Sequence, residues 1–169
     1  EVLTKAKEYG QVEIVDDRLS LPQIDLQFIG NLRAYQQQAV QGILAKDFGV
    51  LEAGTGSGKT VMALAIIAAR KQPSLVLVHN KELLYQWRDK IKQFLNVEAG
   101  LIGDGKFNLQ PLTVGIVNTV RNNLETLTDQ FGHLVTDECH RVPASMFTEA
   151  LTAFPARYSL GLSATPYRR

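Results

Sequence analysis

The most distinctive stretch of the sequence is a glycine-rich run followed by a lysine and a threonine. It matches the pattern G-x-x-x-x-G-K-[ST] except at its first position, and it consists of Ala53, Gly54, Thr55, Gly56, Ser57, Gly58, Lys59 and Thr60. Glycines let backbone N–H groups turn inward around phosphate oxygens at the start of a helix. We expect Lys59 to reach the β- and γ-phosphates of ATP and the Thr60 hydroxyl to ligate Mg²⁺. The alternative is an ordinary glycine-rich turn, but a strand is expected before this run and a buried helix after it.

A second group of reactive side chains, Asp-Glu-Cys-His at residues 137–140, follows an expected strand. Mg²⁺ prefers carboxylate oxygens and keeps most of its waters, so Asp137 suits it as a ligand. Glu138 is placed to orient and deprotonate an attacking water, and His140 to link the nucleotide site to a neighbouring motif. Alone, such a pair is often a solvated turn. A zinc site at Cys139 is disfavoured because no second cysteine or histidine cluster supplies further ligands.

The elements that must position these residues alternate between helical and strand patterns from Asn31 onward. We expect helices over 31–44, 59–69, 80–95, 120–131 and 143–154, and strands over 49–53, 75–78, 114–117, 134–136 and 158–162. This alternation predicts an α/β fold, a mostly parallel sheet with helices on both faces. Ligands of such sheets bind at the carboxyl ends of the strands, where both motifs fall.

Composition limits the possible functions. The chain has 169 residues and a net charge of +1, so any nucleic-acid site must be local rather than a broad basic surface. Its single cysteine fits a reducing compartment, and we expect a cytoplasmic protein. We expect no membrane partner, since no long apolar stretch is present. The first residues, which lack an initiator Met, and the end at Arg168 and Arg169 suggest an excised fragment.

With these motifs in place, the sequence resembles the superfamily 2 helicases. GSGKT at 56–60, DECH at 137–140 and SAT at 163–165 are similar to their motifs I, II and III. The segments 32–36 (LRAYQ), 79–87 and 114–119 are similar to an upstream element and to motifs Ia and Ic. The wording of DECHRVPA and GLSATPYRR is most similar to XPB-like translocases and the motor subunits of type III restriction enzymes. The resemblance covers residues 31–169.

This resemblance implies a RecA-like phosphate-loop NTPase domain that binds ATP and Mg²⁺, with Lys59, Asp137 and Glu138 catalytic. It assigns residues 31–169 to the first of two such domains and leaves 1–30 as a linker or the remnant of an upstream domain. The second domain, absent here, would supply an arginine finger. Arg33 and Gln36 would lie at the adenine, although a polar helix face explains them equally well. His140, Ser163 and Thr165 would couple the ATP state to domain movement.

The same resemblance places nucleic acid on motifs Ia to Ic, at Lys81, Gln86, Gly103, Lys106, Thr119 and Arg121. Binding there would hold phosphates without reading bases. DNA is favoured over RNA, although DECH also occurs in some viral RNA helicases. Three alternatives stay open: an RNA helicase domain, a non-motor phosphate-loop NTPase or kinase, and a binding domain with a relic nucleotide site.

Overall fold

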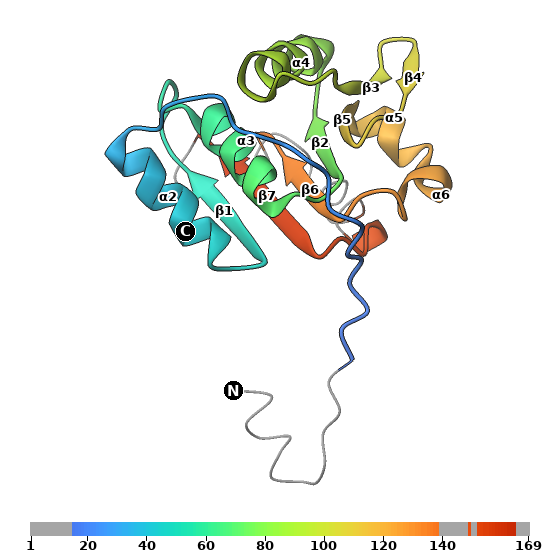
Figure 1. Ribbon diagram of the computed structural model, residues 1–169. Helices are drawn as coiled ribbons and strands as arrows, with labels where there is room; N and C mark the ends of the chain where they lie inside the picture. The colour runs from blue at the N-terminus through green and yellow to red at the C-terminus, as the bar shows by residue number, and fades with distance from the viewer. Residues whose placement is uncertain (1–14, 139–148, 150–151, 165–169) are drawn as a thin grey trace, which may run out of the picture.

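The computed structural model describes residues 15–138, 149 and 152–164. These residues form a seven-stranded sheet in the order β1-β7-β6-β2-β5-β3-β4. Every neighbouring pair is parallel except β3 and β4. Figure 1 shows the helices packed on the two faces of this sheet. The strands are β1 (Phe48–Glu52), β2 (Ser74–Val78), β3 (Gly100–Gly103), β4 (Lys106–Asn108), β5 (Leu112–Ile116), β6 (His133–Thr136) and β7 (Tyr158–Ser163).

Three longer helices pack on one face of the sheet: α2 (Ala34–Leu44), α3 (Lys59–Arg70) and α4 (Lys81–Leu95). Helix α3 is almost entirely apolar, and its residues from Met62 to Ala68 are all buried. Alternate strand residues such as Val76 and Val135 point into the same core. Residues at alternate strand positions face one side, so each strand shares its apolar positions between two layers.

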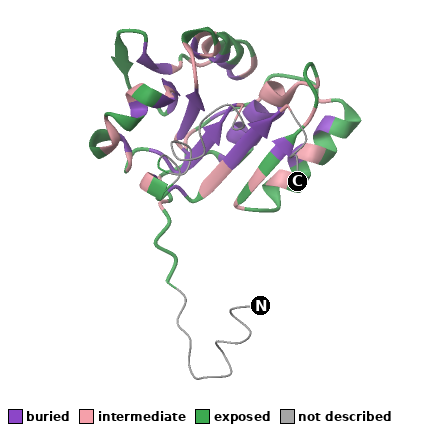
Figure 2. Cartoon of the chain, turned by 180° about the vertical axis from the view of Figure 1, so that it is seen from behind, coloured by how far each residue is buried: buried purple, intermediate pink, exposed green. Residues whose placement is uncertain are grey.

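Two short helices, α5 (Val117–Arg121) and α6 (Leu124–Leu127), cover the other face. Their buried Val120 and Leu127 pack with Leu75, Leu77 and Leu134 of the central strands. The central strands are consequently buried throughout, as Figure 2 shows. The predicted parallel sheet with helices on both faces is confirmed.

Three sequence-based expectations need correction. The helix expected over 120–131 is interrupted at Asn122 and Asn123, because α5 ends and α6 begins there. The strand expected over 114–117 ends at Ile116, where α5 starts. The first helix begins at Ala34, with Arg33 rather than Asn31 as its N-cap. By contrast, the predicted cap of α4 is confirmed, since the Asn80 side chain accepts a hydrogen bond from Leu83 N at 2.9 Å. The expected helix 143–154 lies mostly outside the described residues.

The described part of the N-terminal segment runs along the domain in an extended conformation. Leu19 pairs with Ala156 beside the start of β7. Further along, Ile24 N donates to Lys71 O at 2.8 Å and Ile29 N donates to Phe94 O at 2.7 Å. Leu26 is 8% exposed and belongs to the same core as α3 and α4. Residues 1–14 lie outside the described part of the chain.

Among the described residues, no helix is long and apolar enough to cross a membrane.

Candidate nucleotide site

The glycine-rich run forms a loop between the end of β1 and the start of α3, as predicted. Gly56 and Gly58 have φ of 80° and 85°, values at which a side chain is strained. The loop is joined to the last strand because Ala53 N donates to Ser163 O at 3.1 Å. Lys59 Nζ donates to Ala53 O at 2.6 Å and Gly54 O at 3.1 Å, so its ammonium group lies against the loop backbone. This geometry is a phosphate cradle at a helix N-terminus.

Two side chains of helix α2 donate hydrogen bonds to the backbone of this loop. Gln36 is 7% exposed, and its Nε2 donates to Ser57 O at 2.9 Å, while its Oε1 accepts from Arg33 N at 2.9 Å. The Tyr35 hydroxyl donates to the same Ser57 carbonyl at 2.9 Å. A Cβ atom on Gly58 would lie 2.5 Å from Gln36 Nε2, so the glycine also allows this close approach. Gln36 and Arg33 therefore lie together at the phosphate loop.

The acidic pair follows β6 directly. Asp137 N donates to Leu77 O at 2.9 Å, which extends the sheet by one bond. Asp137 is 7% exposed; its Oδ2 accepts from Trp87 Nε1 at 2.8 Å and its Oδ1 accepts from Glu138 N at 2.9 Å. Burial raises the pKa of this carboxyl, and the hydrogen bond from Trp87 opposes the rise. Glu138 has φ of 48°, in the left-handed region.

The two motifs meet in one cavity of about 290 Å³. Its walls include Thr60 from α3, Asp137 from the end of β6, and Gln86 and Trp87 from α4. A hydroxyl and a carboxylate are the hard oxygen donors that Mg²⁺ takes while keeping several of its waters. Within the described residues, no three histidine, cysteine or acidic side chains gather as a metal cluster, and Mg²⁺ beside a phosphate needs none. Thr60 and Asp137 therefore fit Mg²⁺ in this cavity.

A histidine at the end of β2 faces the predicted base. His79 Nδ1 lies 4.0 Å from Glu138 Oε2. Asn80 Nδ2 lies 3.1 Å from His79 Nε2, and its amide orientation is set because Asn80 Oδ1 accepts from Leu83 N. The amide therefore donates to Nε2, so a neutral His79 carries its proton on Nδ1. That nitrogen is buried and has no hydrogen-bond partner in the described structure.

The predicted nucleic-acid positions fall into two groups. Lys81 and Gln86 are exposed on α4, although Gln86 also lines the cavity beside Thr60. Gly103 and Lys106 flank the tight turn at Asp104 and Gly105, a residue pair typical of such turns, whereas the two strands β3 and β4 that it joins were not predicted.

Tyr85 ties the hairpin to helix α4. Its hydroxyl donates to Asp104 Oδ2 at 2.6 Å, and Lys106 Nζ lies 4.8 Å from the centre of its ring. Lys106 of the hairpin and Lys81 of α4 are therefore exposed on two elements that are in contact through Tyr85.

The second group follows β5, on helix α5. Thr119 is half-buried, and its carbonyl accepts from Asn123 Nδ2 at 2.8 Å. Arg121 Nε forms an ion pair with Glu149 Oε2 at 2.9 Å on the surface. Of the expected coupling residues, Ser163 is 5% exposed at the end of β7, next to the phosphate loop. His140, Thr165, Arg168 and Arg169 lie outside the described residues.

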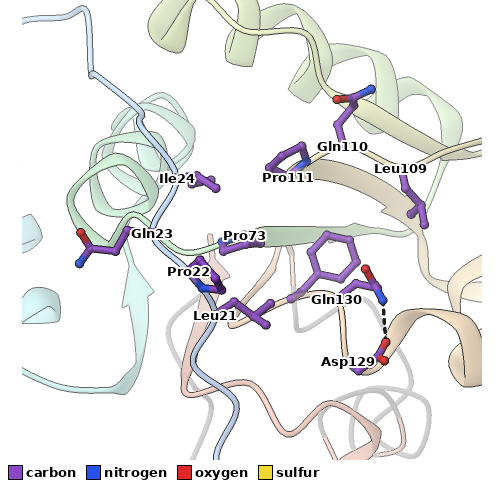
Figure 3. A pocket seen from close by; sticks show the side chains of 11 residues that line it. Leu21, Pro22, Gln23, Ile24, Pro73, Leu109, Gln110, Pro111, Asp129 and Gln130 are labelled. Atoms are coloured by element: carbon purple, nitrogen blue, oxygen red, sulfur yellow. Dashed lines mark hydrogen bonds between the residues drawn. The ribbon is translucent and has the colours of Figure 1, made fainter.

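A separate cavity of about 470 Å³ lies at the opposite end of the sheet (Figure 3). Pro73 and Pro111, which precede β2 and β5, line it together with Leu21 and Phe131. These are the amino ends of the strands, whereas both motifs follow carboxyl ends. This cavity is therefore no part of the nucleotide site, despite its larger volume.

Fold and site together define the class: a RecA-like ATPase domain of the helicase type, with its phosphate loop after the first strand and its acidic pair after β6. The family model of the type III restriction enzyme res subunit matches residues 29–168. The chain belongs to that family, as the resemblance in its motifs implied.

Individual relatives agree with this assignment. The DNA 3'-5' translocase XPB2 of Sulfurisphaera tokodaii is 35% identical over 162 residues, 96% of this chain and 36% of its own. A putative ATP-dependent RNA helicase of African swine fever virus is 32% identical over 89% of this chain and 32% of its own. The Sulfolobus solfataricus SWI2/SNF2 ATPase core, solved with dsDNA, shares the fold with a TM-score of 0.69 at 20% identity, covering 86% of this chain and 34% of that one. This chain thus spans about a third of the length of these two relatives.

Sequence reasoning missed three residues of the site. Trp87 and His79 lie in the segment 79–87 that resembles motif Ia, but neither was among the predicted site residues. Tyr35 lies in the segment 32–36 but was not predicted as a site residue; it is 47% exposed and donates to Ser57 O. No signal in the sequence pointed to these contacts, because each of them joins segments that are separated along the chain.

Proposed function

We propose that the whole protein carrying this chain is a motor that uses ATP hydrolysis to move along or unwind nucleic acid, with DNA favoured over RNA. The observation that carries the proposal is the cavity shared by Thr60 and Asp137, which brings the phosphate loop and the acidic pair to one place. ATP use is common to helicases of this family. The Mg²⁺ ion and the polymer belong to the proposal.

The residues of this chain would act as follows. Backbone N–H groups of residues 53–60 surround the phosphates, and Lys59 exchanges its loop carbonyls for phosphate oxygens. Thr60 and Asp137 would hold Mg²⁺, which neutralises charge that develops on the phosphates. Glu138 orients the attacking water and accepts its proton. Arg33 and Gln36 contact the adenine, for which the Gln36 amide still has a second N–H and a second lone pair.

The polymer would follow the surface of motifs Ia to Ic, at the six positions named above. Cations and backbone N–H groups there bind phosphates regardless of base. The preference for DNA is supported by the name of the Sulfurisphaera relative and by the dsDNA in the Sulfolobus structure. A protein that uses ATP and a polynucleotide in this way would work inside the cell.

A second RecA-like domain of the parent chain is the proposed partner. In this scheme residues 31–169 form the first domain, residues 1–30 lead into it, and His140, Ser163 and Thr165 transmit the ATP state. An arginine from the partner domain can contribute about 10³–10⁵ in rate, so we expect this chain alone to hydrolyse ATP very slowly.

The test is ATP turnover of the full-length protein without polymer and with duplex DNA, single-stranded DNA or RNA, beside Glu138→Gln. Stimulation by duplex DNA that the variant abolishes supports the motor. Stimulation by RNA alone supports the second candidate, an RNA helicase, which the viral relative's name favours. Equal turnover with every polymer would mean a non-motor NTPase and end the nucleic-acid assignments.

A further inference from the structure

The single tryptophan of the chain is hydrogen-bonded to the predicted magnesium ligand. Trp87 is 1% exposed on α4, and its Nε1 donates to Asp137 Oδ2 at 2.8 Å. Packing alone does not explain this choice, since a phenylalanine or leucine fills an apolar core without placing a donor beside a carboxylate. The specific contribution of the indole is therefore the hydrogen bond that its N–H donates to the Asp137 carboxylate.

This bond fixes the plane of the Asp137 carboxylate. Oδ2 is held by the indole and Oδ1 by Glu138 N at 2.9 Å, so the group cannot rotate without losing one of them. The main chain at this position is anchored through the hydrogen bond from Asp137 N to Leu77 O. Each oxygen accepts one of these hydrogen bonds and keeps a further lone pair, and Asp137 lines the cavity together with Thr60. Partners of this kind orient metal ligands and raise metal affinity.

The indole of Trp87 belongs to helix α4, whose opposite side is exposed to solvent. Helix α4 exposes Lys81 and Gln86, and it packs its apolar side, including Leu84 and Ile91, on the sheet and on α3. The Trp87 side chain crosses from that helix to the end of β6. A displacement of α4 relative to the sheet therefore moves the indole N–H relative to Asp137 Oδ2.

We propose that Trp87 is a positioning residue that orients Asp137 for Mg²⁺ and thereby links helix α4 to the nucleotide site. The inference rests on the proposed function for the identity of the metal and nucleotide, and it adds how the metal ligand is held. Trp87 itself touches neither the nucleotide nor the reacting atoms.

The first test is a Mg²⁺ titration of fluorescent ADP binding to the full-length protein. Trp87→Phe keeps a buried ring and removes the N–H. We expect it to raise the Mg²⁺ concentration for half-maximal binding by about tenfold, with nearly normal ADP affinity at saturating Mg²⁺. Ile91→Val is the matched packing control, because Ile91 is 0% exposed one turn along the same face and has no polar side-chain atom. The control should keep the wild-type Mg²⁺ requirement.

A second readout follows the wild-type protein itself, and the variant serves only to assign the signal. The indole ¹H–¹⁵N resonance of Trp87, assigned by its loss in Trp87→Phe, should shift when Mg²⁺ is added to the ADP-bound wild type. A resonance unmoved by Mg²⁺, or a variant with an unchanged Mg²⁺ requirement, overturns the inference while leaving the ATPase intact. A wild type that binds no ADP at any Mg²⁺ concentration defeats the proposed function as well.

Discussion

His79 Nδ1 lies 4.0 Å from Glu138 Oε2, and the neighbouring Asn80 side chain leaves the proton of a neutral His79 on that nitrogen. The imidazole is therefore set to donate toward the predicted base once the two groups close by about 1 Å, as catalytic contacts often do when substrate binds.

This arrangement predicts a selective loss of rate. His79→Phe should lower kcat of the full-length protein roughly tenfold, the equivalent of one hydrogen bond of about 1.4 kcal/mol, while ADP affinity stays unchanged. His79→Asn is the control, since its Nδ2 takes nearly the place of the histidine Nδ1, and it should recover most of kcat. Steady-state turnover beside ADP binding measures both; equal kcat for the two variants would rule out a donor role.

Gly58 predicts a loss of nucleotide binding on a minimal change. Its φ is 85° and an added Cβ would lie 2.5 Å from Gln36 Nε2, so Gly58→Ala must strain the loop and displace the Gln36 amide. We expect a loss of about 1–3 kcal/mol in the free energy of unfolding and weaker ATP binding. Gly42→Ala is the matched control: nothing lies within 4 Å of its Cβ, and it sits inside α2. It should stabilise the protein by about 0.5–1 kcal/mol in urea unfolding.

Gln36 predicts an effect on base selectivity that separates its two contacts. Removing the amide in Gln36→Ala loses the bond to Ser57 O, which weakens ATP and GTP binding alike, and loses the proposed adenine contact, which weakens ATP alone. We expect the dissociation constant of GTP divided by that of ATP to fall at least fivefold in the variant, which corresponds to about 1 kcal/mol of lost preference for ATP. Competition binding with both nucleotides provides the measurement. An equal loss for ATP and GTP would leave Gln36 only the loop contact.

A buried histidine at the far end of the sheet predicts how stability depends on pH. His133 Nε2 lies 2.9 Å from Arg70 Nη1 and its Nδ1 lies 3.3 Å from Ser74 Oγ, which in turn donates to Gln72 O at 2.7 Å. Arginine can only donate, so His133 is neutral with its proton on Nδ1. Burial, with the Arg70 charge adding to it, lowers the pKa of His133 well below 6.5.

The unfolded chain therefore binds a proton that the folded protein does not, and stability must fall as pH falls below about 6.5. We expect the free energy of unfolding to drop with a slope approaching about 1.4 kcal/mol per pH unit beyond that of His133→Gln. Urea unfolding of both proteins between pH 7.5 and 5 compares the slopes. Parallel curves would contradict a neutral buried His133.

The parts of the structure that sequence could predict are those whose signal is local. The phosphate loop is specified by its own glycines, and the buried run Leu75–Val78 can only be an interior strand. The hairpin of β3 and β4 escaped prediction because the residues of β4 are all exposed and carry no apolar pattern. The break between α5 and α6 escaped because apolar spacing continues across Asn122 and Asn123.

The contact between Trp87 and Asp137 could not be foreseen for a different reason. It depends on the register of β2 against β6, which sets Leu77 opposite Thr136 and so determines where both following segments start. The apolar spacing of the helix expected over 80–95 is consistent with a buried Trp87, but it says nothing of the direction in which the indole N–H points.

The pairing of β1 with β7 has a consequence for how the protein is made. Strand β1 is at the edge of the described sheet and pairs in parallel with the last strand, from Phe48 opposite Ser159 to Glu52 opposite Ser163. Non-local parallel pairing forms slowly because a long intervening chain must first be brought together. On the ribosome, the glycine loop emerges early yet has no neighbouring strand until β7 follows. Nascent chains should therefore gain nucleotide affinity only at the end of domain synthesis, and until then the edge strand is exposed to pairing with other chains.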